Sequence, residues 1–210
     1  MSLSVWLTLF AACWAISISP GPGAVASMSS GLRFGFRLGY WNAIGLAIGL
    51  AIQFVISVIG VGALLATSET AFNIIKWAGV LYLIYLGYKQ YWSPVAIIRL
   101  EETAAQDTPI HQLIMQGILV NIMNPKGAIF LLAVIPQFLD LSKPLPIQYV
   151  LIALTLCAVD LVVMAVYTGL AAKVMHVMRN PHHAARMNKF FGLLFIAAAL
   201  FMAGMGQKLA

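Results

Sequence analysis

Six long apolar segments occupy most of this 210-residue chain and constrain its fold more than any other feature. A helix that crosses a bilayer needs about 20 consecutive, mostly apolar residues. The composition supports this class of protein, because 62% of the residues are hydrophobic and only 9% are charged, whereas about 25% are charged in a soluble domain. We therefore predict an all-α integral membrane protein, with a single membrane domain over residues 1–210. The six predicted transmembrane helices lie at about 3–19, 39–65, 72–91, 113–138, 146–171 and 190–207.

The distribution of basic residues predicts how these helices are oriented. The loops after the first, third and fifth segments contain eight lysines and arginines, and the opposite side contains three. The positive-inside rule therefore places the three basic loops in the cytoplasm and both termini outside. If the first segment is re-entrant instead of spanning, the N-terminus moves to the cytoplasm. The eight residues are Arg33, Arg37, Lys89, Arg99, Lys173, Arg179, Arg186 and Lys189, and the three are Lys76, Lys143 and Lys208.

Three pairs of segments match between the two halves of the chain, in the same order. PGPGA from Pro20 matches NPKGA from Asn124, Gln53 and Gly62 match Asp160 and Gly169, and KWAGVLYL from Lys76 matches KFFGLLFI from Lys189. An odd number of spans in each copy makes the copies insert in opposite directions, as in many transporters. We therefore predict two inverted three-helix repeats, at about 1–92 and 112–210, joined by a cytoplasmic loop at about 93–111. Chance similarity between apolar segments is the alternative.

Helix-breaking residues interrupt the first and fourth predicted helices at matching places. Pro20–Gly23 follow the first apolar run, and Asn124 and Pro125 lie inside the fourth. Non-helical backbone at membrane depth is tolerated only where protein or a water-filled cavity surrounds it. Paired interruptions of this kind indicate a central binding site. The first break could equally be an ordinary loop at the cytoplasmic end of a short first helix.

The broken helices bring together groups that suit a small polar solute. Exposed helix N-termini carry partial positive charge and favour a carboxylate, while terminal carbonyls and asparagine amides suit an ammonium or hydroxyl group. Gln53 can hydrogen-bond a substrate or bridge two helices. The expected substrate-binding residues are Pro20, Gly21, Pro22, Gly23, Gln53, Asn121, Asn124, Pro125 and Lys126.

Asp160 is the only acidic residue deep inside a predicted span. An ionised side chain at the centre of a membrane helix costs about 2.5–3.5 kcal/mol, so such residues face a cavity or a partner and are usually functional. We expect Asp160 to couple transport to protons or to bind a substrate amine. A buried salt bridge with Lys126 is the structural alternative.

The sequence offers little support for a cofactor, a metal ion or catalysis. Cys13 and Cys157 lie inside predicted spans without a CxxC pair, which disfavours redox chemistry. His176, His182 and His183 lack accompanying cysteines or carboxylates, so a metal site is not expected. No nucleophile–base set suggests an enzyme. The net charge of +6 reflects the basic loops rather than nucleic-acid binding.

Three stretches of the sequence resemble one family of transporters. They are SPGPGA at the end of the first segment, KWAGVLYLIYLGYKQYW in the third and NIMNPKGAIFLLAVIPQF in the fourth. Together with the length and the six apolar segments, they resemble the lysine-exporter superfamily of bacterial amino-acid efflux proteins. The closest likeness is to the homoserine/threonine exporter branch (LysE/RhtB type), and it covers nearly the whole chain.

This resemblance implies a multi-pass protein of the bacterial inner membrane that exports a small amino acid, with protons and the lipid bilayer as its other partners. The proton-motive force would drive the export of homoserine, threonine or homoserine lactone. Lysine or arginine, leucine and cysteine derivatives are alternative substrates, and a non-transporting membrane scaffold is an alternative function. The resemblance leaves a homo-oligomer open.

Overall fold

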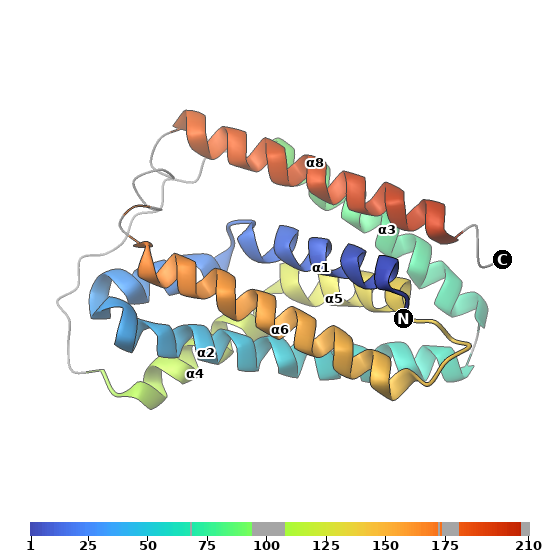
Figure 1. The fold of residues 1–210 in the computed structure, drawn as a ribbon, viewed down its shortest axis with the longest axis horizontal. Helices are drawn as coiled ribbons and strands as arrows, with labels where there is room; N and C mark the ends of the chain where they lie inside the picture. Colours follow the sequence, from blue (N-terminus) through green and yellow to red (C-terminus); the bar gives the residue numbers. More distant parts are fainter. Residues whose placement is uncertain (68, 94–107, 172, 174–180, 207–210) are drawn as a thin grey trace.

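The computed structural model describes residues 1–67, 69–93, 108–171, 173 and 181–206, and the described part is helical (Figure 1). The N-terminus and the C-terminal end of the last helix lie at the same end of the molecule. Much of the predicted loop at 93–111 lies outside the described residues, as do Arg99, His176, Arg179 and Lys208. The helices are α1 (Leu3–Ile18), α2 (Pro22–Thr67), α3 (Glu69–Tyr91), α4 (Ile110–Ile122), α5 (Pro125–Phe138), α6 (Leu145–Gly169) and α8 (Pro181–Gly206).

The length and apolar character of the described helices agree with the predicted membrane protein. Pro22–Gly62 of α2 and the whole of α6 are each long and apolar enough to cross a membrane. The pair α4 and α5 meets the same criteria together, with a bend of 60° between the two helices. Large apolar side chains also cover the outside, where Ile59 and Leu81 are each 66% exposed, as expected for a surface that contacts lipid. The arrangement as six spans in two inverted repeats stays a prediction.

The first break is a short non-helical segment between two helices. Ser19 follows α1 in an extended conformation (φ −64°, ψ 118°), which is the conformation that a following proline favours. The helix resumes at Pro22, where a proline at the first helical position loses no hydrogen bond. The non-helical segment is thus confined to residues 19–21, and Pro22 and Gly23 already belong to α2.

Gly35 reverses the direction of α2 (Figure 1). Its φ of 71° and ψ of 178° lie in a region that glycine adopts readily and other residues rarely do. The two parts of α2, residues 22–34 and 36–67, then approach closely, since a Cβ added at Gly39 would lie 2.7 Å from the Ser30 carbonyl oxygen. Arg33 and Arg37, assigned above to the first loop, lie in helix on either side of this turn.

The second half begins with a similar broken pair of helices. Helix α4 ends at Ile122, and Asn124 caps the start of α5 by accepting a hydrogen bond from the Lys126 N–H at 3.1 Å. Each half of the chain thus contains a short helix, a break, a second short helical stretch, a reversal and then long helices. This common order agrees with the predicted repeat, whose inversion stays untested.

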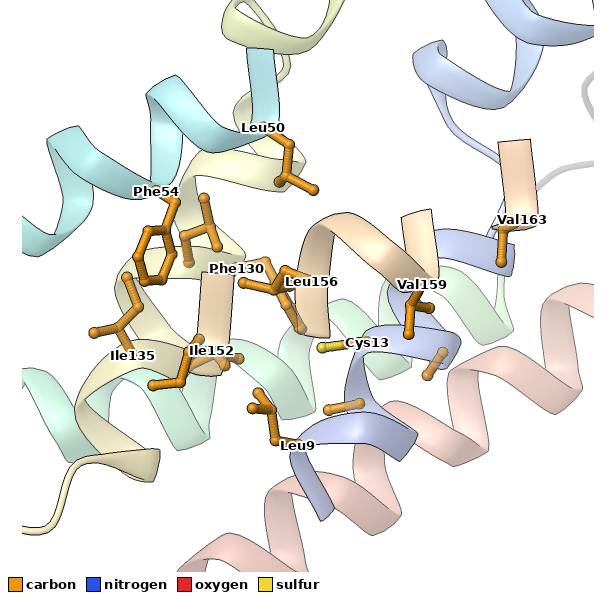
Figure 2. Packing of buried hydrophobic residues seen from close by; sticks show 14 of the residues in the cluster. Leu9, Cys13, Leu50, Phe54, Phe130, Ile135, Ile152, Leu156, Val159 and Val163 are labelled. Carbon is orange, nitrogen blue, oxygen red and sulfur yellow. The ribbon is translucent and has the colours of Figure 1, made fainter. Parts of the chain in front are cut away.

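Close contacts between backbones hold the helices together. Helix α2 packs mainly against α4 and α6, and α3 packs beside α8 on one face of the molecule (Figure 1). Glycines make these contacts, because an added Cβ at Gly87 would lie 2.7 Å from the Gly192 carbonyl oxygen. Apolar side chains of α1, α2, α5 and α6 pack against one another and form the core (Figure 2). Leu9, Phe130, Ile135 and Ile152 are among its fully buried members.

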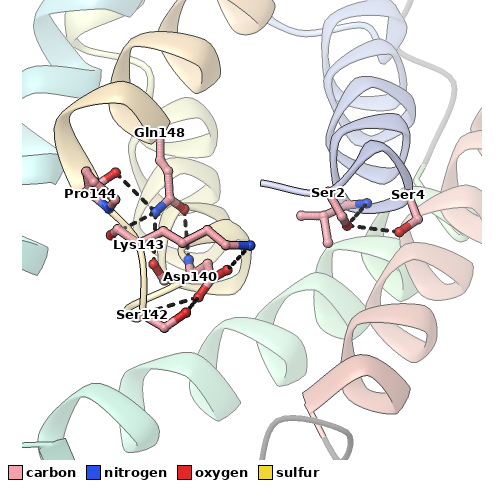
Figure 3. A network of polar contacts seen from close by, with 8 residues as sticks. Ser2, Ser4, Asp140, Ser142, Lys143, Pro144 and Gln148 are labelled. Carbon is pink, nitrogen blue, oxygen red and sulfur yellow. Dashed lines mark hydrogen bonds and ion pairs between the residues drawn. The ribbon is translucent and has the colours of Figure 1, made fainter.

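Polar contacts fix the loop between α5 and α6 (Figure 3). The buried amide of Gln148 donates to the Asp140 carbonyl at 2.8 Å and accepts from the Asp140 N–H at 2.8 Å. Ser142 donates to the Asp140 carboxylate from both its hydroxyl and its N–H, and Lys143 Nζ lies 2.9 Å from the other carboxylate oxygen. The hydrogen bonds from Ser142, followed by the Lys143 contact, lower the pKa of Asp140 to about 2.

We expect Gly45→Ala to destabilise the protein. A Cβ at this position would overlap the carbonyl of Ile114 where α2 crosses α4, and overpacking of this kind costs about 1–3 kcal/mol. Thermal unfolding in detergent measures the effect. Gly60→Ala is the matched control, because a Cβ there meets nothing within 4 Å. An equal melting temperature for the two variants would contradict the close crossing.

We expect Asp140→Asn to lower the melting temperature at pH 7. The folded-state pKa of Asp140 is depressed to about 2, so its charged form stabilises the protein above the unfolded-state pKa of about 4. This contribution is lost as the pH falls toward 2. The difference in melting temperature between wild type and variant should therefore be constant above about pH 4. It should shrink as the pH falls from about 4 toward 2. A difference that stays constant with pH would argue against the Asp140 contacts.

Candidate functional site

A cavity of about 70 Å³ lies between the two helix breaks. Since one water needs about 10–15 Å³, the cavity has room for several waters or one small solute. Its polar wall contains Ser17, Ser19, Asn121, Asn124, Lys126 and Asp160. Its apolar wall contains Ile16, Leu46, Leu50, Phe130, Leu156 and Met164, and small residues complete it at Gly21, Gly23, Ala24 and Gly127.

Asp160 lines the cavity and has one carboxylate oxygen without a hydrogen-bond partner among the described residues. It lies near the middle of α6 on the face that also buries Leu156 and Met164, and only 8% of its surface is exposed. Ser17 at the end of α1 donates to its Oδ1 at 3.3 Å. In the part of the chain that the structure describes, Oδ2 has no hydrogen-bond partner. A buried polar atom without a partner is costly, so Oδ2 is suited to bind a ligand's donor group.

Lys126 connects the two breaks across the cavity. It lies in the first turn of α5, and its ammonium donates to Ser19 Oγ at 2.7 Å. The same ammonium lies 5.8 Å from the ring centre of Phe195 on α8, within the range of a cation–π interaction. Among the described residues, Lys126 and Asp160 form no ion pair. The simple buried salt bridge considered from the sequence is therefore not formed, although both residues line the cavity.

Helix ends of opposite polarity meet at the cavity. Helices α1 and α4 end beside it, and α2 and α5 begin there. Asn124 caps the start of α5, but Gly21, which precedes α2, has no side chain that could cap a helix. The residues that follow in the first turn of α2, Gly23 and Ala24, line the cavity. The partial positive charge of a helix N-terminus favours an anion at this position.

Gln53 and Asn121 hold the end of α4 against α2. Gln53 Nε2 donates to the carbonyl oxygens of Ile122 at 3.1 Å and Asn124 at 3.2 Å. Asn121 Nδ2 donates to the Leu46 carbonyl at 2.6 Å. The two Gln53 bonds satisfy carbonyls that the break frees from the helix. Gln53 therefore lies behind the cavity wall, where it positions the second break.

The structure brings together six of the ten residues that the sequence analysis selected for this site. The six that line the cavity are Gly21, Gly23, Asn121, Asn124, Lys126 and Asp160. The other four lie outside its lining: Pro20, Pro22, Gln53 and Pro125. Pro22 and Pro125 are exposed and begin α2 and α5. They therefore shape the breaks without facing the cavity.

The sequence analysis did not select Ser17 and Ser19, which contact Asp160 and Lys126. Their signal was present, because both hydroxyls directly precede the first break in an otherwise apolar run. As for metal ions, the described residues contain no group of three histidine, cysteine or acidic side chains that could hold one.

Comparisons with known proteins agree with each other. A family model described as LysE type translocator matches residues 14–206. An uncharacterized membrane protein of Vibrio cholerae is 38% identical, with 97% of this chain and 98% of that protein covered. A homoserine/homoserine lactone efflux protein of Salmonella typhimurium is 36% identical over the same shares. A leucine efflux protein of an Enterobacter species is 28% identical, with 97% and 96% covered. No solved structure matches.

We expect Gln53→Leu to destabilise the protein, because the carbonyls of Ile122 and Asn124 lose their shared donor. An unsatisfied buried polar group costs about 1–3 kcal/mol. Gln116→Leu is the matched control, since Gln116 is exposed on α4. Melting temperatures in detergent should fall for the first variant only. If both variants melt like wild type, the role of Gln53 at the break is wrong.

Proposed function

The chain belongs to the LysE type translocator family, and we propose that it exports a small neutral amino acid with the energy of the proton-motive force. Homoserine, threonine and homoserine lactone are the proposed substrates, in keeping with the Salmonella relative, which is a homoserine/homoserine lactone efflux protein. We place the protein in the bacterial inner membrane as a multi-pass carrier with two inverted repeats. No catalytic step or cofactor is part of this proposal.

One observation carries the proposal: the cavity between the helix breaks contains separate groups for both ends of a zwitterion. Asp160 Oδ2 has no hydrogen-bond partner among the described residues, and an ammonium group is a strong donor to a carboxylate. Lys126 and the uncapped start of α2 lie on other parts of the same cavity. A substrate carboxylate would bind there, where a cation and a helix N-terminus both favour an anion.

Lys126 and Asp160 can serve two ends of one solute because they do not neutralise each other. Lys126 contacts Ser19 and Asp160 contacts Ser17, so each charge is held by a neutral hydroxyl. Such hydroxyls can accept or donate and can turn toward a ligand. A free amino acid would then replace hydrogen bonds between a charge and a neutral hydroxyl by hydrogen bonds between opposite charges.

Asp160 also provides a way to couple export to protons. Its carboxyl group can hold either a proton or the substrate ammonium, because both compete for the same charge. A proton arriving from outside would displace the amine and release the substrate. Return of the empty carrier with the proton would complete an exchange of one for the other. Lone acidic residues in membrane helices serve as proton relays in many carriers.

An amino acid with an apolar side chain is the second candidate substrate. The leucine efflux relative and the apolar wall at Leu50, Phe130, Leu156 and Met164 favour it. Lysine or arginine fits less well, because Asp160 would have to serve two amino groups and Lys126 would repel the second. A passive channel or a non-transporting scaffold would make no use of the charged pair.

Asp160→Asn tests the coupling role. Proteoliposomes with an imposed pH gradient and radiolabelled L-homoserine measure gradient-driven transport. We expect at least about a tenfold loss in this variant, since a hydrogen bond to a charged group contributes about 1.5–3 kcal/mol. Asp160→Glu, which keeps the charge, should retain part of the transport. Gradient-driven transport that survives Asp160→Asn unchanged would refute the coupling role, and non-saturable flux in wild type would indicate a channel.

A further inference from the structure

Packing or backbone conformation explains most of the well-described glycines. Gly35 has a positive φ, and a Cβ at Gly31, Gly45 or Gly117 would overlap the backbone of a neighbouring helix. Such glycines are required where two helices approach closely. They therefore need no ligand to account for them.

Gly21 and Gly23 have neither explanation. A Cβ added at Gly21 would meet nothing closer than the Ser19 carbonyl oxygen at 3.9 Å. At Gly23 the nearest atom would be Leu46 Cδ2 at 3.5 Å. Both are ordinary van der Waals distances, and neither glycine has a positive φ. An alanine would also favour the helix at Gly23 by about 1 kcal/mol, so local energetics disfavours the glycine that is present.

Both glycines line the cavity. A methyl group at either position would make only ordinary van der Waals contacts with protein, so we infer that it would narrow the cavity. At Gly23 an added methyl group would pack against Leu46, an apolar residue of the cavity lining. A bound amino acid whose carboxylate meets the start of α2 would bring its side chain close to these two small residues.

We propose that Gly21 and Gly23 set the upper size of the exported side chain, so that the cavity accepts amino acids up to about the size of homoserine. This inference rests on the proposed function. In a cavity of about 70 Å³ one added methyl group removes a large share of the room. One methylene more or less in a fitted pocket changes selectivity by about 10–200-fold. Gly21 and Gly23 are thus specificity-determining residues.

The experiment compares two substrates that differ by one methylene. Purified protein in proteoliposomes exchanges internal for external radiolabelled L-serine or L-homoserine without an imposed gradient, so the readout is independent of proton coupling. Wild type should exchange both amino acids. In Gly23→Ala and in Gly21→Ala, the ratio of homoserine to serine exchange should fall at least about tenfold while serine exchange is retained.

Two further variants distinguish an effect on the size of the cavity from an effect on the flexibility of the backbone at the break. Gly60→Ala is the control, because Gly60 is exposed on α2, away from the cavity, and a Cβ there meets nothing within 4 Å. It should leave the ratio unchanged. Leu46→Val added to Gly23→Ala removes the atoms nearest to the new methyl group and should restore part of the homoserine exchange. Melting temperatures confirm that each variant is folded.

The outcomes distinguish this inference from the function on which it rests. If wild type exchanges neither amino acid nor leucine, the proposed function and the inference both fail. If wild type exchanges them but both alanine variants slow serine and homoserine equally, only the inference fails, and the glycines serve the motion of the break instead. Exchange of leucine by wild type as fast as homoserine would also overturn the size limit.

Discussion

The protection of backbone polar groups at the two helix breaks is the constraint on which this structure depends. In a bilayer, an unpaired N–H or C=O that faces lipid costs several kcal/mol. The protein meets this requirement with side chains from other helices. Gln53 bonds the carbonyls that follow α4, and the Tyr167 hydroxyl donates to the Ile18 carbonyl at the end of α1 at 2.6 Å. The breaks must therefore lie inside the helix bundle, and the cavity forms between them.

Gln53 and Asp160 show how matching positions in the two halves take different roles. Gln53 has an amide that donates to the freed carbonyls, so it closes the second break structurally. Asp160 has no donor when ionised, and it accepts from Ser17 with one oxygen while the other has no partner among the described residues. Gln53 Oε1 also has no partner among the described residues, so the two positions differ in charge rather than in having an unpaired oxygen. A fully symmetric pair of amides would leave no charge for a substrate amine or a proton.

Local sequence patterns predicted much of the fold, and their errors have a physical cause. The apolar run at 3–19 became α1 at Leu3–Ile18, and the break at Asn124 and Pro125 separates α4 from α5. The helix that resumes at Pro22 was misread as part of a loop, because proline and glycine signal both turns and helix starts. Nothing distinguished Gly35 from the other glycines as the point of reversal, since a positive φ is a property of the folded backbone.

The sequence by itself determined the membrane environment, the two breaks, the buried acid and the family, because hydropathy and helix-breaking residues act locally along the chain. Only the tertiary structure decided which groups share the cavity. It paired Lys126 with Ser19 instead of Asp160, kept Gln53 out of the cavity lining and placed Gly21 and Gly23 in that lining without a close contact. These outcomes depend on the rotation and spacing of packed helices, where a shift of one residue turns a side chain by about 100°.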